Sequence, residues 1–335
     1  MNCLSWSIGY GRLKNRKGRA EELREKFGLK KLHNEILLDR FRTMSQPTLV
    51  SKTNGLSGKL YIASQMDKID KIGYDCVAAC VNDMAALGAE PLFFYVNISC
   101  VRPKADKIKG IEERIAQACT EARIQFAGSE IVELPDTYAL DQYEIAGFIV
   151  GIVDRKKKIG DAQLADGDII MGLASDGLHN NGYVLARKQL FLSKATMEVY
   201  YDTLGGTLGD QLLRPTRIYR ASMERLMESG IEIKSCVQVA HGGIDRALHL
   251  LLHEKYGAVV KRRTDTIPPL YHMLHKDGNI DMQQMRETFN MGIGMLLIVS
   301  EENSERAAEY LEEAGENVIF LGLVETEREL IRYLE

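Results

Sequence analysis

The segment from Asp166 to Lys188 concentrates residue types that could bind an anionic ligand. A short apolar run leads into the polar stretch Ser175 to Gly182 (SDGLHNNG), after which the composition is typical of a helix. Such a turn leaves unpaired backbone N–H groups at a helix N-terminus, where the dipole favours negative charge. His179 is the only group in the turn expected to exchange a proton near neutral pH. The alternative is a capped loop, with Asn180 or Asn181 as the cap.

Carboxylates at two other positions could hold a divalent cation. Asn82 and Asp83 interrupt an otherwise apolar helical pattern, and a buried carboxylate is costly unless it meets a cation or a donor. Glu130 and Glu133 follow Gly128, where they could hold a metal or orient a substrate amine. Mg²⁺ prefers oxygen ligands, so a Mg²⁺ site beside phosphates is one interpretation. A surface aspartate and a polar loop are the others.

The polar turn resembles the S-S-G-P-H-S-N-G-Y segment of the aminoimidazole ribonucleotide synthetase family of purine synthesis. The resemblance continues in the same order from about Leu49 to the end of the chain, which makes coincidence a poor explanation. The strings that carry it lie at 75–83, 87–94, 128–135, 143–148, 213–219 and 289–295.

The resemblance implies an ATP-dependent cyclo-ligase that converts formylglycinamidine ribonucleotide to aminoimidazole ribonucleotide. In that reaction ATP phosphorylates the formamide oxygen, the amidine nitrogen attacks the activated carbon, and phosphate leaves as the imidazole closes. Activation is needed because an amide oxygen is a poor leaving group. The implied cofactors are ATP and Mg²⁺, and the implied partners are a small ribonucleotide substrate and a second copy of the chain.

The resemblance also implies roles for individual residues. His179, Lys59 and Glu130 would be catalytic, with His179 as a proton shuttle or substrate anchor. Residues for ATP would be Asn54, Lys59, Asn82, Asp83 and Gly128, and those for Mg²⁺ Asp83 and Glu130. Residues for the ribonucleotide would be Ser175, His179, Asn181, Gly182, Thr216, Arg217, Gly242, Gly243 and Asn290.

The chain departs from the family pattern at several positions. Asn54 replaces the aspartate of the family's G-T-D-G-V-G-T-K string, and an amide binds Mg²⁺ more weakly than a carboxylate does. Ile131 replaces a threonine, and residues 35–42 contain no glycine where the family has G-G-F-G. These differences motivate an alternative: a divergent paralogue with altered or lost catalysis, acting as a nucleotide- or ribonucleotide-binding or regulatory protein.

Hydrophobic periodicity predicts the elements that position these residues. We expect an α/β (α+β) two-domain fold, with an ATP-binding and dimerisation domain at 1–165 and a C-terminal domain at 166–335. Each domain should be a mixed sheet covered by helices on one face. The first should contain a turn at 53–55 and a solvated hairpin near 155–161. Other expected elements are strands at 48–50, 59–63, 91–98, 125–132, 143–154, 168–174, 293–299 and 317–324, and helices at 74–88, 104–123, 180–194, 215–229, 243–254 and 303–315.

Composition narrows the class of protein. The 335 residues carry a net charge of −4, and no apolar run is long enough to cross a membrane. The first ten residues lack the pattern of a secretory signal, and the six cysteines are scattered, which favours a reducing cytoplasm. The basic segment 12–31 is either a phosphate-binding arm or a solvated helix, and we expect no nucleic-acid partner because the chain is acidic overall.

Overall fold

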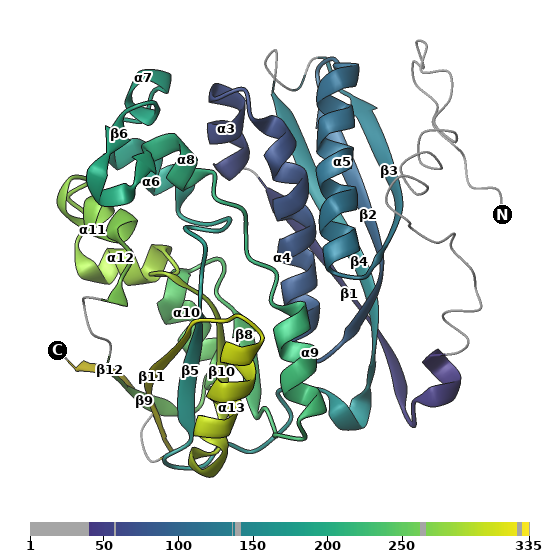
Figure 1. Ribbon diagram of the computed structural model, residues 1–335, viewed down its shortest axis with the longest axis vertical. Helices are drawn as coiled ribbons and strands as arrows, with labels where there is room; N and C mark the ends of the chain where they lie inside the picture. Colours follow the sequence, from purple (N-terminus) through teal and green to yellow (C-terminus); the bar gives the residue numbers. More distant parts are fainter. Residues whose placement is uncertain are drawn as a thin grey trace.

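The computed structural model describes residues 40–56, 58–135, 137, 142–261, 266–326 and 330–334. The predictions for the basic segment 12–31 and for most of 35–42 concern residues outside these ranges. Two sheets form the framework, each with its own helices (Figure 1). In the described part of the chain, no helix combines the length and the apolar character needed to cross a membrane.

The N-terminal sheet has four strands in the order β1-β4-β2-β3. Only the β2–β3 pair is parallel. Helices α4 and α5 cover one face, where their buried isoleucine, valine and cysteine side chains meet the sheet (Figure 1). The elements are β1 (Pro47–Leu56), α3 (Gly58–Gln65), α4 (Ile72–Ala86), β2 (Glu90–Cys100), α5 (Ala105–Glu121), β3 (Gln125–Glu133) and β4 (Tyr143–Asp154).

The strand register determines which side chains share a face of this sheet. Asn54, Gly147, Val96 and Ser129 lie in one row across the four strands. The next row contains Gly55, Ala146, Asn97 and Glu130. Because side chains alternate between faces along a strand, Asn54 and Glu130 point to opposite faces.

Two local predictions in the first domain were wrong. The turn expected at 53–55 is part of β1, because ladder pairing with β4 continues to Leu56. The strand expected at 59–63 is the helix α3, which buries Leu60 and Ile62. The hairpin expected near 155–161 begins as a single 3-10 turn, Arg155–Lys157, capped by the side chain of Asp154.

The C-terminal sheet has six strands in the order β12-β9-β11-β5-β10-β8, and helices cover both of its faces rather than one. Alternate residues of β10 explain this: Met295 and Leu297 pack toward α9 and α13, whereas Leu296 and Ile298 belong to the core that contains α10. The principal elements are β5 (Ile169–Ala174), α6 (Tyr183–Gln189), α8 (Leu208–Leu212), α9 (Arg220–Glu228), β8 (Ser235–Gln238), α10 (Gly243–Leu251), β9 (Gly257–Lys261), α11 (Pro269–Lys276), α12 (Met282–Thr288), β10 (Ile293–Val299), α13 (Glu301–Glu313), β11 (Val318–Glu325) and β12 (Ile331–Leu334). Smaller elements are η1 (Ile69–Lys71), η2 (Arg155–Lys157), α7 (Lys194–Met197), β6 (Tyr200–Tyr201), η3 (Asp202–Leu204) and β7 (Gly206–Thr207).

The helix expected at 215–229 begins only at Arg220. Residues 214–219 have no regular secondary structure and lie against α4 of the first domain through hydrogen bonds described below. Hydrogen bonds to Asp75 and Asn82 engage the backbone of Thr216, Arg217 and Tyr219 there. We call residues 214–219 the crossing segment, since it joins the two domains at the predicted site.

Candidate active site at the domain interface

The polar turn between β5 and α6 contains several residues with positive φ angles. Gly182 is the N-cap of α6 with φ of 82°, and a Cβ there would lie 2.2 Å from Phe289 Cε1. Gly177 and His179 also have positive φ values, of 96° and 53°. Such backbone is easy for glycine and uncommon for other residues. The turn is therefore shaped by packing against the β10 end of the domain.

Predicted ligand-binding side chains hold this turn in place. The Asn290 amide donates to the Gly177 carbonyl at 3.0 Å, and Ser175 Oγ donates to the same oxygen at 2.8 Å. The Tyr271 hydroxyl also donates to that carbonyl, at 2.9 Å, and contacts Asn290 Oδ1. Asn290 is buried, so its position fits a scaffold function. Asn181 is half-buried at the start of the helix.

His179 is buried, and its environment differs from the expectation. Desolvation first, and then the charges of Lys59 and Arg217, lower the pKa of its imidazole from 6.5 to about 3. The ring is therefore neutral at pH 7, so the expectation of proton exchange near neutrality was wrong for this environment. Nε2 accepts a long hydrogen bond, 3.5 Å, from the Arg217 backbone N–H, which assigns the ring proton to Nδ1. Among the described residues, Nδ1 has no hydrogen-bond partner.

Arg217 lies at the edge of the site, with its guanidinium held by the C-terminal domain. Nε donates to Glu316 Oε2 at 2.8 Å, and another guanidinium nitrogen donates to the Gly315 carbonyl at 2.6 Å. Asp176 of the polar turn is 3.6 Å away. The Arg217 side chain is 32% exposed, so part of the guanidinium stays accessible to a ligand.

Lys59 lies deeper than a phosphate ligand would require. Its side chain is fully buried and donates to Asp75 Oδ1 at 2.6 Å and to the Arg214 carbonyl. Asp75 Oδ1 also accepts from Thr216, at 2.7 Å from the backbone N–H and at 2.6 Å from Oγ1. Burial lowers the pKa of Lys59, and the Asp75 carboxylate opposes that effect. Contact between Lys59 and a phosphate stays a prediction.

Asn82 and Asp83 are adjacent in sequence but face different partners. Asn82 is buried against the crossing segment, donating to the Arg217 carbonyl at 2.8 Å and accepting from the Tyr219 N–H at 3.0 Å. Asp83 instead faces β1, where Asn54 donates to its Oδ2 at 3.0 Å. Burial raises the pKa of Asp83, and the Asn54 hydrogen bond opposes the increase.

A single chain does not bring the two predicted Mg²⁺ ligands together. Asp83 contacts Asn54 on the β1 edge, whereas Glu130 is on β3 at the other edge and on the opposite face. Three strand spacings separate those edges by roughly 14 Å. No group of three His, Cys, Asp or Glu side chains in the described ranges is arranged to hold a metal ion. One chain therefore does not fit a complete Mg²⁺ site.

Gly128 and Glu130 line a hollow of about 370 Å³ on the face of the N-terminal sheet that α4 and α5 leave open. Tyr95 and Phe148 lie beside them and are 39% and 43% exposed. A Cβ at Gly128 would meet no atom within 4 Å, so a ligand or partner could approach this backbone closely. On the other face, Ser129 Oγ donates to Glu112 of α5 at 2.6 Å.

The glycine pair at the start of α10 is explained by packing. Gly242 and Gly243 have φ values of 88° and 65°. A Cβ at Gly243 would lie 2.2 Å from the Arg286 carbonyl oxygen of α12. The pair therefore lets α10 and α12 approach closely, and its role as a phosphate cradle stays a prediction.

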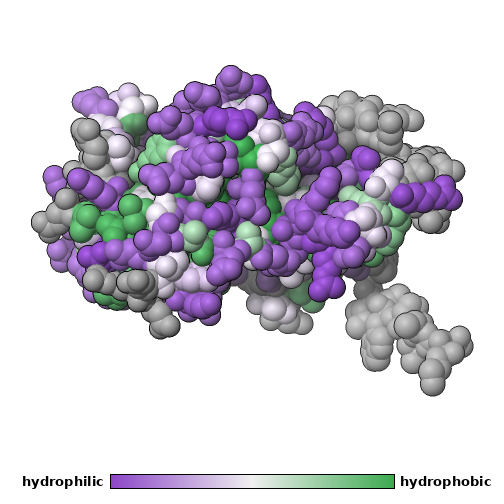
Figure 2. Space-filling view, turned by 90° about the horizontal axis from the view of Figure 1, so that it is seen from below, coloured by the Kyte–Doolittle hydropathy of each residue, from purple (hydrophilic) through white to green (hydrophobic). Residues whose placement is uncertain are grey.

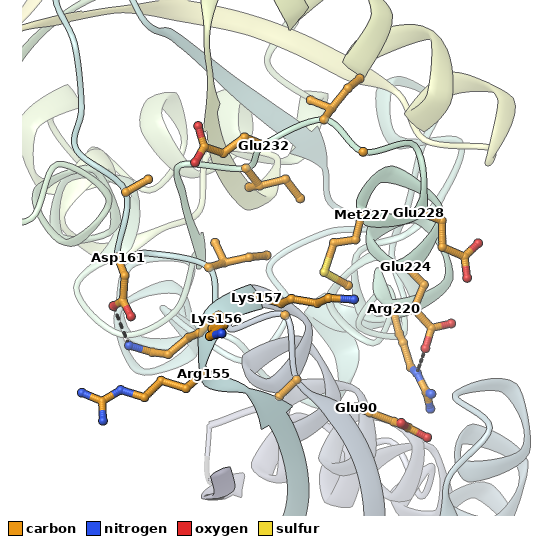
Figure 3. Close-up of a pocket in the computed structure, with 18 of the residues that line it drawn as sticks. Glu90, Arg155, Lys156, Lys157, Asp161, Arg220, Glu224, Met227, Glu228 and Glu232 are labelled. Carbon is orange, nitrogen blue, oxygen red and sulfur yellow. Dashed lines mark hydrogen bonds and ion pairs between the residues drawn. The ribbon is translucent and has the colours of Figure 1, made fainter. Parts of the chain in front are cut away.

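A larger cleft, of about 1200 Å³, lies between the domains and contains none of the predicted site residues. One side carries Arg155, Lys156 and Lys157 of η2, and Glu228 and Glu232 lie on the side of α9 and the loop after it (Figure 3). Figure 2 shows one face of the molecule, on which hydrophilic residues predominate and hydrophobic ones appear in small patches.

Comparison with known proteins connects the chain to one family over nearly its whole length. The domain family described as AIR synthase related protein, N-terminal domain, matches residues 38–153, and its C-terminal counterpart matches residues 165–335. The chain is 43% identical to a phosphoribosylformylglycinamidine cyclo-ligase from Lachnoclostridium phytofermentans over 288 residues, covering 86% of this chain and 84% of the relative. It is 40% identical to one from Brevibacillus brevis, covering 85% and 83%.

Solved structures share the fold at lower identity. The hydrogenase maturation protein HypE of E. coli superposes with a TM-score of 0.65 at 16% identity, covering 94% of this chain and 92% of HypE. The structure of T. maritima PurL complexed with ATP has a TM-score of 0.57 at 15% identity, covering 95% of this chain and 46% of PurL. The predicted two-domain α/β fold is confirmed. With both domain families matched and relatives at 40% identity or more, the chain belongs to the AIR synthase related protein family.

Proposed function

We propose that this protein is an ATP-dependent cyclo-ligase that converts formylglycinamidine ribonucleotide to aminoimidazole ribonucleotide in purine synthesis. The observation that carries the proposal is 43% identity to a relative of that name over 86% of the chain, spanning both domains. The polar turn, the crossing segment and α4 meet at one domain interface, which suits a site built from both halves of the chain.

The described residues suggest how the substrate is held. His179 would act as a neutral hydrogen-bond donor through Nδ1, since its ring does not titrate near pH 7. Arg217 and Asn181 would position the ribonucleotide, with Thr216 and the glycines at 182, 242 and 243 shaping the pocket. ATP as co-substrate would phosphorylate the formamide oxygen and leave as ADP, so that ring closure by the amidine nitrogen would expel phosphate. A ligand held by donors whose charge does not change during the reaction keeps its reacting atoms aligned.

The proposed nucleotide site needs a second copy of the chain. Asp83 and Glu130 would bind the same Mg²⁺ only if a partner supplied one of them, because they lie at opposite edges of the sheet in one chain. Leu49, Tyr95 and Phe148 expose apolar surface on the open face of that sheet, which a partner could cover. We therefore propose a homodimer through this face, and a cytoplasmic location for the enzyme.

Substrate-dependent ATP turnover tests the proposed function. Purified protein given formylglycinamidine ribonucleotide and Mg-ATP should release equal amounts of ADP and aminoimidazole ribonucleotide, and the gene should restore purine-independent growth to a strain lacking the cyclo-ligase. Glu130→Gln should lower this turnover, and Glu302→Gln, at an exposed position of α13, is its matched control. Absence of turnover in well-folded wild-type protein would rule out the proposal.

The alternative function, a paralogue that binds ligands without catalysis, is motivated by the Asn54–Asp83 hydrogen bond, in which an amide occupies the position beside the carboxylate. Thermal-shift titration separates the two functions, since a ligand that binds only the folded state must raise the melting temperature. A shift with the ribonucleotide and none with Mg-ATP would favour the alternative.

A further inference from the structure

Asp75 is a fully buried carboxylate in the first turn of α4, and the proposed reaction assigns it no role. One of its oxygens, Oδ1, receives three donors: Lys59 Nζ, the Thr216 N–H and Thr216 Oγ1. Lys59 belongs to the first domain and Thr216 to the crossing segment. Asp75 therefore ties the two domains together at the predicted substrate site.

The crossing segment is fixed to α4 at a second point. Asn82 follows Asp75 by seven residues, which is about two helical turns, so both side chains emerge from the same face of α4. Asn82 holds the Arg217 carbonyl and the Tyr219 N–H, while Asp75 holds Thr216 and Lys59 holds the Arg214 carbonyl. Both ends of the segment are thus fastened to one rigid helix.

Stability alone is a weak explanation for this arrangement. A buried ion pair often contributes little net stability, because desolvation of both charges offsets their attraction. The second oxygen of Asp75 is buried and has no hydrogen-bond partner among the described residues, which adds a further cost. The geometry has a clear effect, however, since the Arg217 N–H is directed at His179 Nε2. That contact leaves the imidazole proton on Nδ1.

We propose that Asp75 is a positioning residue that holds the crossing segment, and thereby the Arg217 backbone and the His179 tautomer, in the geometry that receives the ribonucleotide. Lys59 assists as the buried counter-ion that also holds the Arg214 carbonyl. The positional part depends only on the contacts above, whereas the effect on the substrate rests on the proposed function.

Hydrogen exchange tests whether Asp75 holds the crossing segment, and it requires no measurement of enzyme activity. In Asp75→Asn, the Thr216 N–H loses its bond to a charged acceptor, so its amide should exchange at least tenfold faster, in line with the strength of such bonds. The matched control is Asp168→Asn, which removes another buried carboxylate that pairs with Lys234 inside the C-terminal domain. It should leave exchange in 214–219 unchanged. Unaltered exchange in Asp75→Asn, or equal acceleration in both variants, would overturn the proposal.

Kinetics then test the effect on the substrate. Thr216→Val is a milder variant that keeps the Lys59–Asp75 pair and removes only one donor, so it covers the case in which Asp75→Asn does not fold. Both variants should raise KM for the ribonucleotide roughly tenfold, the value of one lost hydrogen bond to a charged group, with KM for ATP unchanged. Asp168→Asn should lower the melting temperature but should not raise KM for the ribonucleotide relative to KM for ATP. Equal changes in the KM values for the ribonucleotide and for ATP would contradict the proposal. An inactive wild type would refute the proposed function, and hydrogen exchange would then be the test of whether Asp75 holds the crossing segment.

Discussion

At the scale of single residues, the environment decides what each predicted site residue can do. Burial makes the His179 ring neutral at pH 7, and two protein partners engage the Lys59 ammonium. Asn54 and Asp83, which lie 29 residues apart in sequence, form one hydrogen bond. The protonation state of each group cannot be deduced from residue type alone, because desolvation and hydrogen bonding can shift the pKa of the same side chain in opposite directions.

The buried His179 should make the protein less stable in mild acid. Its folded pKa of about 3 is below the unfolded value of 6.5, so the unfolded state binds the proton first and stability falls as pH drops below 6.5. Between pH 7 and pH 5, this residue should account for a loss of roughly 2 kcal/mol. Urea unfolding of wild type and His179→Gln at both pH values checks it, with the exposed His241→Gln as control. Parallel losses in wild type and His179→Gln would contradict the assignment.

Asn54→Asp should create a carboxylate pair with Asp83 that responds to Mg²⁺. The change replaces a hydrogen bond by like-charge repulsion, so unfolding free energy without metal should fall by about 1 to 3 kcal/mol. Mg²⁺ should then recover stability in the variant more than in wild type, because it binds the pair only in the folded state. Melting temperature across a Mg²⁺ series measures the difference. Asn54→Ala, which adds no charge, should show no gain in the Mg²⁺ response.

At the scale of elements, positive-φ turns and close helix contacts explain most of the glycines in the site. Helices α6 and α10 each begin where a glycine meets another backbone or ring. The sequence places these glycines at the start of helices, which suggested phosphate binding. The structure supplies a packing reason at each position, with Phe289 and Arg286 as the close neighbours.

Gly182→Ala should destabilise the C-terminal domain strongly, whereas Gly128→Ala should be nearly neutral. Alanine at 182 combines a φ of 82° with a contact at 2.2 Å to Phe289, so we expect a loss of about 2 kcal/mol or more. At Gly128 nothing lies within 4 Å of the added methyl group. Equilibrium urea unfolding compares the two variants. Similar stability for both would contradict the packing explanation.

At the scale of the whole molecule, the N-terminal sheet is covered on one face and open on the other, while the C-terminal sheet is covered on both. The open face carries Tyr95, Phe148 and Glu130, which are the groups that a second copy would meet in the proposed homodimer. The proposed association would thus use the face that carries Glu130, whereas Asp83 lies on the covered face beside Asn54.

Phe148→Lys should therefore weaken the proposed dimer and ATP turnover together. A charge placed in an apolar interface must be desolvated without a partner, which is costly. Sedimentation should show wild type at twice the 37.6 kDa chain mass and the variant shifted toward a single chain. Phe320→Lys, at another exposed phenylalanine on β11, should leave the mass unchanged. A wild type that sediments as one chain would refute the dimer.

Sequence by itself determined the family, the two-domain α/β fold and most helices and strands, because hydrophobic periodicity and motif order are local properties of the chain. It also placed Ser175 to Gly182, Thr216 and Arg217 in one functional group. Only the tertiary structure decided which faces these residues occupy. Strand register puts Asp83 and Glu130 on opposite sides of a sheet, and burial of α4 against the crossing segment makes Asp75 a central contact. Register and burial arise from long-range pairing, which residue types and their spacing do not specify.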